Sequence, residues 1–117
     1  MTAVGAAFRL SVRRDLSKVQ VEISGKGYEL TDAVKENIRE RIKKLTRFDD
    51  NIQYVSVVVD KESRAIKNVE ARVKLHHSML VTEESNKDVE AAIHGAFDKM
   101  KRRVKRLREK IAKDKTS

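Results

Sequence analysis

Basic side chains are the residues of this chain that could do chemistry, and one segment is especially dense in them. Between Lys99 and Lys110, eight of twelve residues are Lys or Arg, and Glu109 is the only acid. Residues 98–117 hold ten basic and three acidic side chains, so they supply +7 of the net charge of +9. Arg offers a planar fork of donors and Lys a mobile point charge, and both suit phosphate groups. The segment therefore predicts a polyanionic partner.

The spacing of these cations predicts that they lie on two flanks of a helix. At about 100° per residue, Lys101, Lys105 and Arg108 fall on one side of an apolar stripe. The other side holds more of them: Lys99, Arg102, Arg103, Arg106, Lys110 and Lys113. An earlier helix has two cations beside its apolar stripe and three along its outer side, namely Arg41 and Lys44, then Arg39, Lys43 and Arg47.

Two such helices lying side by side on one sheet would merge their basic flanks into one positive surface. Basic residues near a helix C-terminus also complement the helix dipole, and many charge runs are only solvated. Here so few acids balance the cations that self-repulsion disfavours a purely structural role. Each neutralised phosphate releases counterions, so binding should weaken steeply with salt. The residues that we predict to bind RNA are Arg41, Lys44, Arg47, Lys99, Arg102, Arg103, Arg106 and Lys110.

Aromatic side chains are scarce, which narrows the kind of nucleic acid. The chain has no Trp and five other aromatic residues, and two of these, Phe48 and Phe97, lie on predicted core stripes. Single strands are usually bound by stacking their bases on aromatic side chains. The sequence therefore favours recognition of folded RNA through its shape and its phosphates.

Other classes of function find little support. The chain has no Cys, which excludes thiolate chemistry and Cys-ligated metals, and no apolar run approaches the roughly 20 residues that span a bilayer. His76, His77 and His94 lack the spacing of a metal site. No nucleophile elbow or Gly-rich phosphate loop is present. The long basic helix could lie on a membrane surface, but its apolar stripe has the width expected of a helix packed on a sheet, and it lacks Trp. We expect no enzyme, cofactor, metal, small-molecule substrate or membrane partner.

Hydrophobic periodicity predicts the elements that position the cations. Alternation of period two, or a β-branched run, predicts strands at residues 19–24, 54–60, 69–76 and 79–84. Apolar spacings of three and four predict helices at residues 32–47 and 87–112. Their N-terminal caps are expected at Thr31 or Asp32, and at Ser85 or Asn86.

Short linkers imply that the last three strands form an antiparallel meander, with the first helix crossing between the first two strands. Both helices then cover one face of the sheet. The predicted fold class is α+β, with the order β-α-β-β-β-α and a four-stranded sheet that has two parallel helices packed on one face.

We expect a single domain at residues 19–112, because the chain is long enough for one core and has no internal repeat. Residues 1–18 are expected to form a flexible basic N-terminal arm. An organelle-targeting presequence is the alternative for that segment, since it is rich in Arg and poor in acids. Residues 113–117 are expected to form a short C-terminal tail.

Four segments of the chain form an ordered set of motifs. They are VQVEISGKG from Val19, ELTDAV from Glu29, RIKKL from Arg41 and DVEAAIHGAFDKM from Asp88. Together they resemble the ribosome hibernation promoting factor family in its short form, also called ribosome-associated inhibitor A or sigma 54 modulation protein. The resemblance extends over residues 19–112.

The resemblance implies the β-α-β-β-β-α fold and binding to the small ribosomal subunit. Family members bind 16S rRNA at the decoding region, between head and body, and block mRNA and the A- and P-site tRNAs, which silences translation in stationary phase or stress. It further implies a cytoplasmic, ribosome-associated protein that is a monomer off the ribosome. The family's rRNA-contacting positions fall on Arg41, Lys44 and Arg47 in the first helix and on Lys99, Arg102, Arg103 and Arg106 in the second.

The chain departs from the family pattern in three places. Glu90 stands where the family usually has Tyr, although an acid near a helix N-terminus is locally favourable. The N-terminal arm exceeds the family norm. The chain also lacks the C-terminal domain of long members and the long tail of some short members. Two alternative functions stay open: a general double-stranded-RNA-binding module, and a protein-interaction module acting on a transcription factor.

Overall fold

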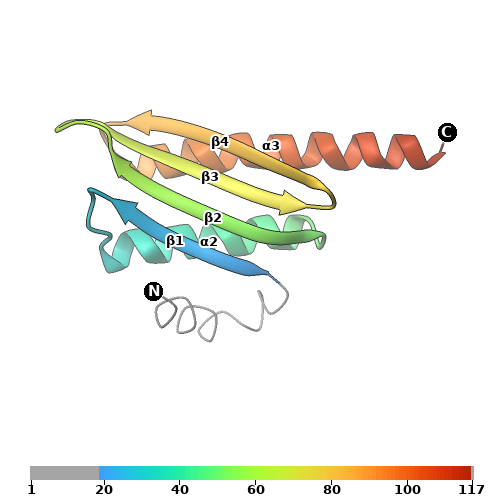
Figure 1. Ribbon diagram of the computed structural model, residues 1–117, viewed down its shortest axis with the longest axis horizontal. Coiled ribbons are helices and arrows are strands. Elements are labelled where there is room, and N and C mark those ends of the chain that lie inside the picture. Colours follow the sequence, from blue (N-terminus) through green and yellow to red (C-terminus); the bar gives the residue numbers. More distant parts are fainter. Residues whose placement is uncertain (1–18, 117) are drawn as a thin grey trace.

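The computed structural model of the chain describes residues 19–116. The elements follow the predicted order (Figure 1): β1 (Gln20–Lys26), α2 (Asp32–Phe48), β2 (Ile52–Lys61), β3 (Lys67–Leu75), β4 (Ser78–Asn86) and α3 (Val89–Thr116). The N-terminal arm predicted at residues 1–18 lies outside the described residues.

The strands form one sheet in the order β1-β2-β3-β4. β1 and β2 are parallel, so α2 crosses between them, while β2, β3 and β4 form the predicted antiparallel meander. The register pairs Val57 of β2 with Ile23 of β1 on one side and with Ala71 of β3 on the other. Because side chains alternate along each strand, this register gathers apolar residues on one face of the sheet.

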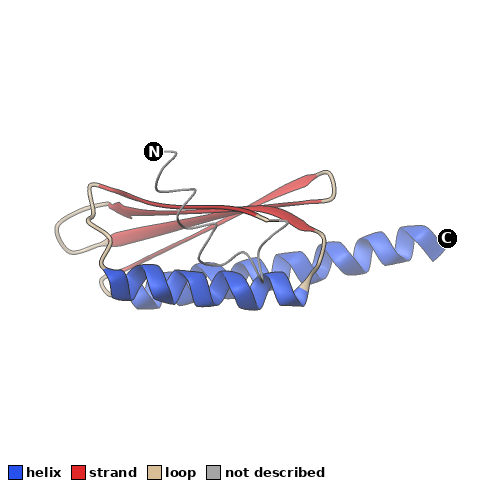
Figure 2. Ribbon diagram, turned by 90° about the horizontal axis from the view of Figure 1, so that it is seen from below, coloured by secondary structure: helices blue, strands red, loops and turns tan. Residues whose placement is uncertain are grey.

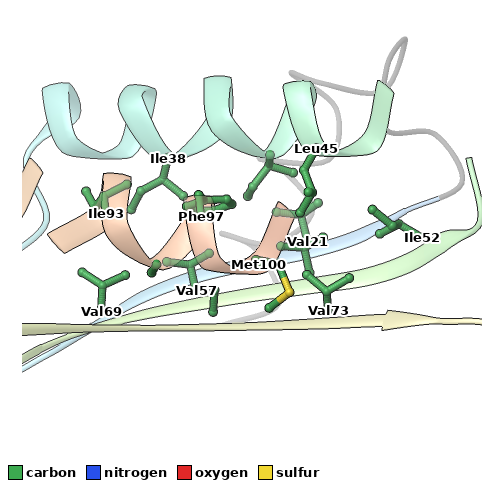
Figure 3. Close-up of a cluster of buried hydrophobic side chains, with 14 of the residues drawn as sticks. Val21, Ile38, Leu45, Ile52, Val57, Val69, Val73, Ile93, Phe97 and Met100 are labelled. Atoms are coloured by element: carbon green, nitrogen blue, oxygen red, sulfur yellow. The ribbon is translucent and has the colours of Figure 1, made fainter. Parts of the chain in front are cut away.

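Both helices cover that apolar face and run in the same direction (Figures 1 and 2). α2 buries its stripe through Ile38 and Leu45, and α3 buries Met100, whose side chain lies among Val57 and Val73 of the sheet (Figure 3). All five side chains are buried in one hydrophobic core. The predicted fold class is therefore confirmed.

The helix ends differ from the prediction mainly in α3. Thr31 caps α2, as expected, because its Oγ1 accepts a hydrogen bond from the Val34 N–H at 3.2 Å. α3 begins later than predicted: Asp88 caps it by accepting from the Glu90 N–H at 3.1 Å. The predicted cap Asn86 instead ends β4 and accepts from the Asp88 N–H.

The C-terminal end of α3 was also predicted too early. The helix does not stop at Ala112 but continues to Thr116, so residues 113–116 are helical and do not form a tail. With 28 residues, α3 is far longer than the strands it covers, and its last turns project beyond the sheet (Figures 1 and 2). The basic residues of these turns are therefore held away from the body of the domain.

Two turns show why the chain changes direction where it does. Near the end of β1, a Cβ on Gly25 would lie 2.1 Å from the carbonyl oxygen of Tyr28, and just after the strand Gly27 has a φ of +68°, so both positions require glycine. Between β3 and β4, His76 has a φ of +56° and forms the turn with His77. The expectation that His76 ends the third strand was wrong.

Candidate nucleic-acid interface

The two flanks of α3 face different neighbours, because its buried stripe, centred on Met100 and Val104, is turned toward the sheet. The flank with Lys101 faces α2, and the flank with Lys99 and Arg103 faces β4. The predicted merging of the second flank with the cations of α2 was therefore wrong. The basic residues of the two helices do meet, but through the opposite flank of α3.

A groove of about 200 Å³ separates the two helices on the side away from the sheet. Three cations line it, Arg41 and Lys44 from α2 and Lys101 from α3, and Asp98 is the one acid in its lining. Leu45, Phe97 and His94 complete the lining. Lys44 and Lys101 are exposed and Arg41 is half-buried, so the charged ends are open to a ligand. This arrangement favours an anion with an apolar or planar part.

The acid in the groove is held in its ionised form. The side chain of Asp98 forms a hydrogen bond and an ion pair with Arg102, one turn along the same helix. The hydrogen bond from Arg102 and its positive charge lower the pKa of the Asp98 carboxyl below its ordinary value. One negative charge therefore stays at the rim, and three cations still outnumber it.

The ring of Phe48 lies at the C-terminal end of α2 and is covered by two cations. Lys101 Nζ is 5.3 Å and Arg108 Cζ is 4.9 Å from the ring centroid, both within cation–π range. Phe48 is half-buried and packs against the core. Its ring therefore serves the helix pair and is not free to stack a base, in agreement with the scarcity of aromatic platforms in the sequence.

The other basic flank of α3 lies over β4, an edge strand of the sheet. Lys99 Nζ donates to the Glu83 carbonyl at 2.8 Å and pairs with Glu84 Oε1 at 2.6 Å, and Arg103 Nη1 donates to the Val81 carbonyl at 2.8 Å. Unpaired edge carbonyls are thus capped by basic side chains. With Arg102 and Arg106, these two residues line a hollow of about 320 Å³.

The predicted RNA-binding residues thus fall into three groups. Arg41 and Lys44 lie in the groove between the helices, and Lys99, Arg102, Arg103 and Arg106 lie over β4. Arg47 and Lys110 are exposed and line neither hollow. Sequence reasoning left Lys101 out of the set. Its spacing placed it on a basic flank, but not on the flank that would meet α2.

Two other classes of site receive no support from the described part of the chain. No helix within residues 19–116 combines the length and the apolarity needed to cross a bilayer. Within the same residues, no three acidic, His or Cys side chains gather as a metal site would require. The exposed cations beside the two helices therefore remain the candidate site among the described residues.

Comparison with known proteins places the chain in a protein family. The sequence model of the Sigma 54 modulation protein / S30EA ribosomal protein family matches residues 21–112. The chain belongs to this family. The match confirms the resemblance drawn from the four motifs.

Relatives of this S30EA protein carry informative names. The ribosome hibernation promoting factor of Azotobacter vinelandii is 33% identical over 92 residues, which cover 79% of this chain and 85% of that protein. The ribosome hibernation promotion factor of Staphylococcus aureus (strain COL) is 30% identical over 95 residues, which cover 80% of this chain and 50% of that protein. The chain therefore corresponds to about half of the Staphylococcus protein.

Solved structures show the same S30EA fold. The N-terminal domain of Thermus thermophilus Protein Y is 28% identical, with a TM-score of 0.67 over 74% of this chain and 94% of that domain. A ribosomal subunit interface protein from Coxiella burnetii has a TM-score of 0.71 at 17% identity, over 76% of this chain and 97% of that one. The second likeness supports the fold alone.

Proposed function

We propose that this protein is a ribosome hibernation factor that binds the 16S rRNA of the small ribosomal subunit. The observation that carries the proposal is the groove between α2 and α3, which Arg41, Lys44 and Lys101 line together with one acid. The names of its relatives, ribosome hibernation promoting factors, support the same role. Such a protein acts in the cytoplasm, on the ribosome.

The mechanism that we propose is steric and makes or breaks no bond. The groove cations and the exposed Arg102 and Arg106 bind phosphates of the rRNA at the decoding region. The folded body, 50 × 30 × 19 Å in extent, then occupies the space that mRNA and the A- and P-site tRNAs would need. Arg offers bidentate contacts and Lys mobile ones, so the surface can follow an irregular RNA backbone.

The residues divide by how free they are to bind RNA. Arg102 and Arg106 are exposed and hold no sheet carbonyl among the described contacts. Arg102 is paired with Asp98, so we assign Arg106 the stronger RNA contact on that flank. Lys99 and Arg103 already donate to β4, and RNA would share their remaining donors. Arg47 and Lys110 extend the positive surface along each helix.

Sedimentation with purified small subunits tests the proposal. The wild-type chain should pellet with the subunits and be released by excess tRNA and mRNA. The double variant Arg41→Glu, Lys101→Glu should remain in the supernatant. The matched control is Lys61→Glu with Lys74→Glu, which makes the same charge change at exposed strand residues outside both basic hollows. Binding that ignores tRNA and mRNA, or that the control loses equally, would contradict the proposal.

A general double-stranded-RNA-binding module is the second candidate, and one observation favours it. Phe48 is covered by Lys101 and Arg108, so the contacts left to the protein are phosphate contacts that read shape and not sequence. This candidate predicts comparable affinity for plain RNA duplexes and for small subunits. A gel-shift series over duplex length and salt separates the two candidates.

A further inference from the structure

One side chain ties the end of α2 to α3. Arg108 Nη1 donates to the carbonyl oxygen of Phe48, the last residue of α2, at 3.1 Å. Its guanidinium carbon is 4.9 Å from the centroid of the Phe48 ring, and its Nε is 3.5 Å from Asp49 Oδ2. A single guanidinium thus contacts a helix-terminal carbonyl, an aromatic face and a carboxylate.

The buried side chain of Asp49 explains why Arg108 is held in this position. Its side chain is 1% exposed, and only one of its carboxylate oxygens has a hydrogen bond, from the Asn51 N–H at 2.8 Å. The other oxygen, Oδ2, is buried without a hydrogen bond. A buried carboxylate is costly unless a cation compensates it. Arg108 is the cation that the described contacts place beside it, so the burial of Asp49 holds Arg108 in place.

The contacts of Arg108 with Phe48 and Asp49, which we call the tie, lie where they can affect the spacing of the two helices that line the groove. α3 packs mainly on β3 and β4, whereas α2 contacts β2 and α3, so the spacing of the two helices depends on the contacts between them. Arg108 lies seven residues after Lys101, and the C-terminal turns of α3 project beyond the sheet (Figure 2). A tie at this point fixes the direction of the projecting turns relative to α2.

We propose that Arg108 is a positioning residue: through Asp49 and Phe48 it fixes α3 against the end of α2, and thereby sets the spacing of the cations in the groove. Its role in RNA binding rests on the proposed function, whereas its role in helix spacing does not. Arg108 acts through the geometry of Arg41, Lys44 and Lys101. Two of its own donor atoms, Nη1 and Nε, are engaged by Phe48 and Asp49.

The variant Asp49→Asn separates positioning from charge by the sign of its effect. It removes a negative charge, so electrostatics alone would tighten binding to small subunits. It also removes the carboxylate that forms the ion pair with Arg108, so positioning predicts weaker binding, by about threefold to tenfold. Asp50→Asn is the matched control: the same charge change at an exposed neighbour should leave binding unchanged or slightly tighter.

Coupling between the two residues provides a second measurement. Asp49→Asn and Arg108→Gln should each weaken binding, and the double variant should be no weaker than Arg108→Gln alone, because both remove the same tie. Should Asp49→Asn fail to fold, Arg108→Lys takes its place, since it keeps the charge but loses the planar fork. Additive effects of the two substitutions, or an Asp49→Asn variant that binds as tightly as Asp50→Asn, would overturn the proposal.

Distance measurements test the tie without RNA. The chain has no Cys, so nitroxide labels at Glu40→Cys and Glu109→Cys report specifically on the separation of α2 and α3. The distance distribution should be narrow in this background and widen when Asp49→Asn or Arg108→Gln is added. An unchanged distribution overturns the proposal. Widening in a protein that does not pellet with small subunits would sink the proposed function and leave the tie standing.

Discussion

Lys101 of α3 lies across the groove from Arg41 of α2, and the Lys101 ammonium also lies 5.3 Å from the centre of the Phe48 ring. The aromatic contact holds the end of a flexible side chain at the rim of the groove. On binding a phosphate, Lys101 should therefore lose less side-chain conformational entropy than a cation whose side chain projects into water. This relationship makes Lys101 the groove residue whose substitution should be most visible.

Neutralising Lys101 should weaken RNA binding and reduce its dependence on salt. The slope of log affinity against log salt falls by roughly 0.7 to 0.9 for each phosphate that the protein no longer neutralises, so Lys101→Gln should show about that change in titrations of small subunits. Lys105→Gln, an equal charge change at an exposed residue that does not line the groove, should alter the slope less. Equal slopes for the two variants would argue against a phosphate site in the groove.

Arg103 should matter for stability as well as for binding. Its hydrogen bond to the Val81 carbonyl caps the edge of β4, so Arg103→Ala should lower the free energy of unfolding by about 1 kcal/mol. Arg106→Ala, on the same flank but without a described bond to the strand, should leave that free energy within about 0.5 kcal/mol of wild type. Urea denaturation followed by circular dichroism measures both.

Substitution of two glycines, one near the end of β1 and one in the connector to α2, should destabilise the fold to different extents. Gly25→Ala forces a Cβ to 2.1 Å from the Tyr28 carbonyl oxygen, a backbone clash that should lower the free energy of unfolding by about 3 kcal/mol. Gly27→Ala meets no close atom but keeps a φ of +68°, which should lower it by only about 1 kcal/mol. Thermal unfolding of both variants checks the order, and the reverse order would mean that the connector is built differently.

Asp98→Asn should tighten binding to small subunits, because it removes the one acid that lines the groove. The pKa of Asp98 lies below its ordinary value, so the favourable pairing with Arg102 is present above that ordinary value and disappears only as the pH falls through the lowered pKa. Between roughly pH 5 and 8, the wild-type and Asp98→Asn affinities should therefore change in parallel. A gap that closes as the pH approaches 5 would mean that Asp98 titrates there.

The elements could be predicted because their apolar patterns are regular. The recurrence of Val34, Ile38 and Ile42 every four residues predicted α2 within one residue at its C-terminal end, and Thr31 is its cap. The N-terminus of α3 was missed because several residues before it have capping side chains. β4 uses Asn86 as its last residue, which leaves Asp88 as the cap.

The orientation of α3 could not be predicted from its own sequence. A helical projection shows that Lys101 and Arg103 lie on opposite sides of the apolar stripe, but both sides carry cations. Which of them faces α2 depends on how the chain turns from β4 into the helix, and tertiary packing decides that. The capping of β4 by Lys99 and Arg103 was missed for the same reason, because it requires knowing that this flank meets a sheet edge.

Under the proposed function, the cations on two opposite flanks would make α3 a bivalent element toward RNA. If each flank holds a separate stretch of backbone, then release of one leaves the other in place, and the first can rebind before the protein diffuses away. Residence on the target would then be much longer than either contact alone allows. A modest rise in ionic strength, acting on both flanks at once, would shorten it abruptly.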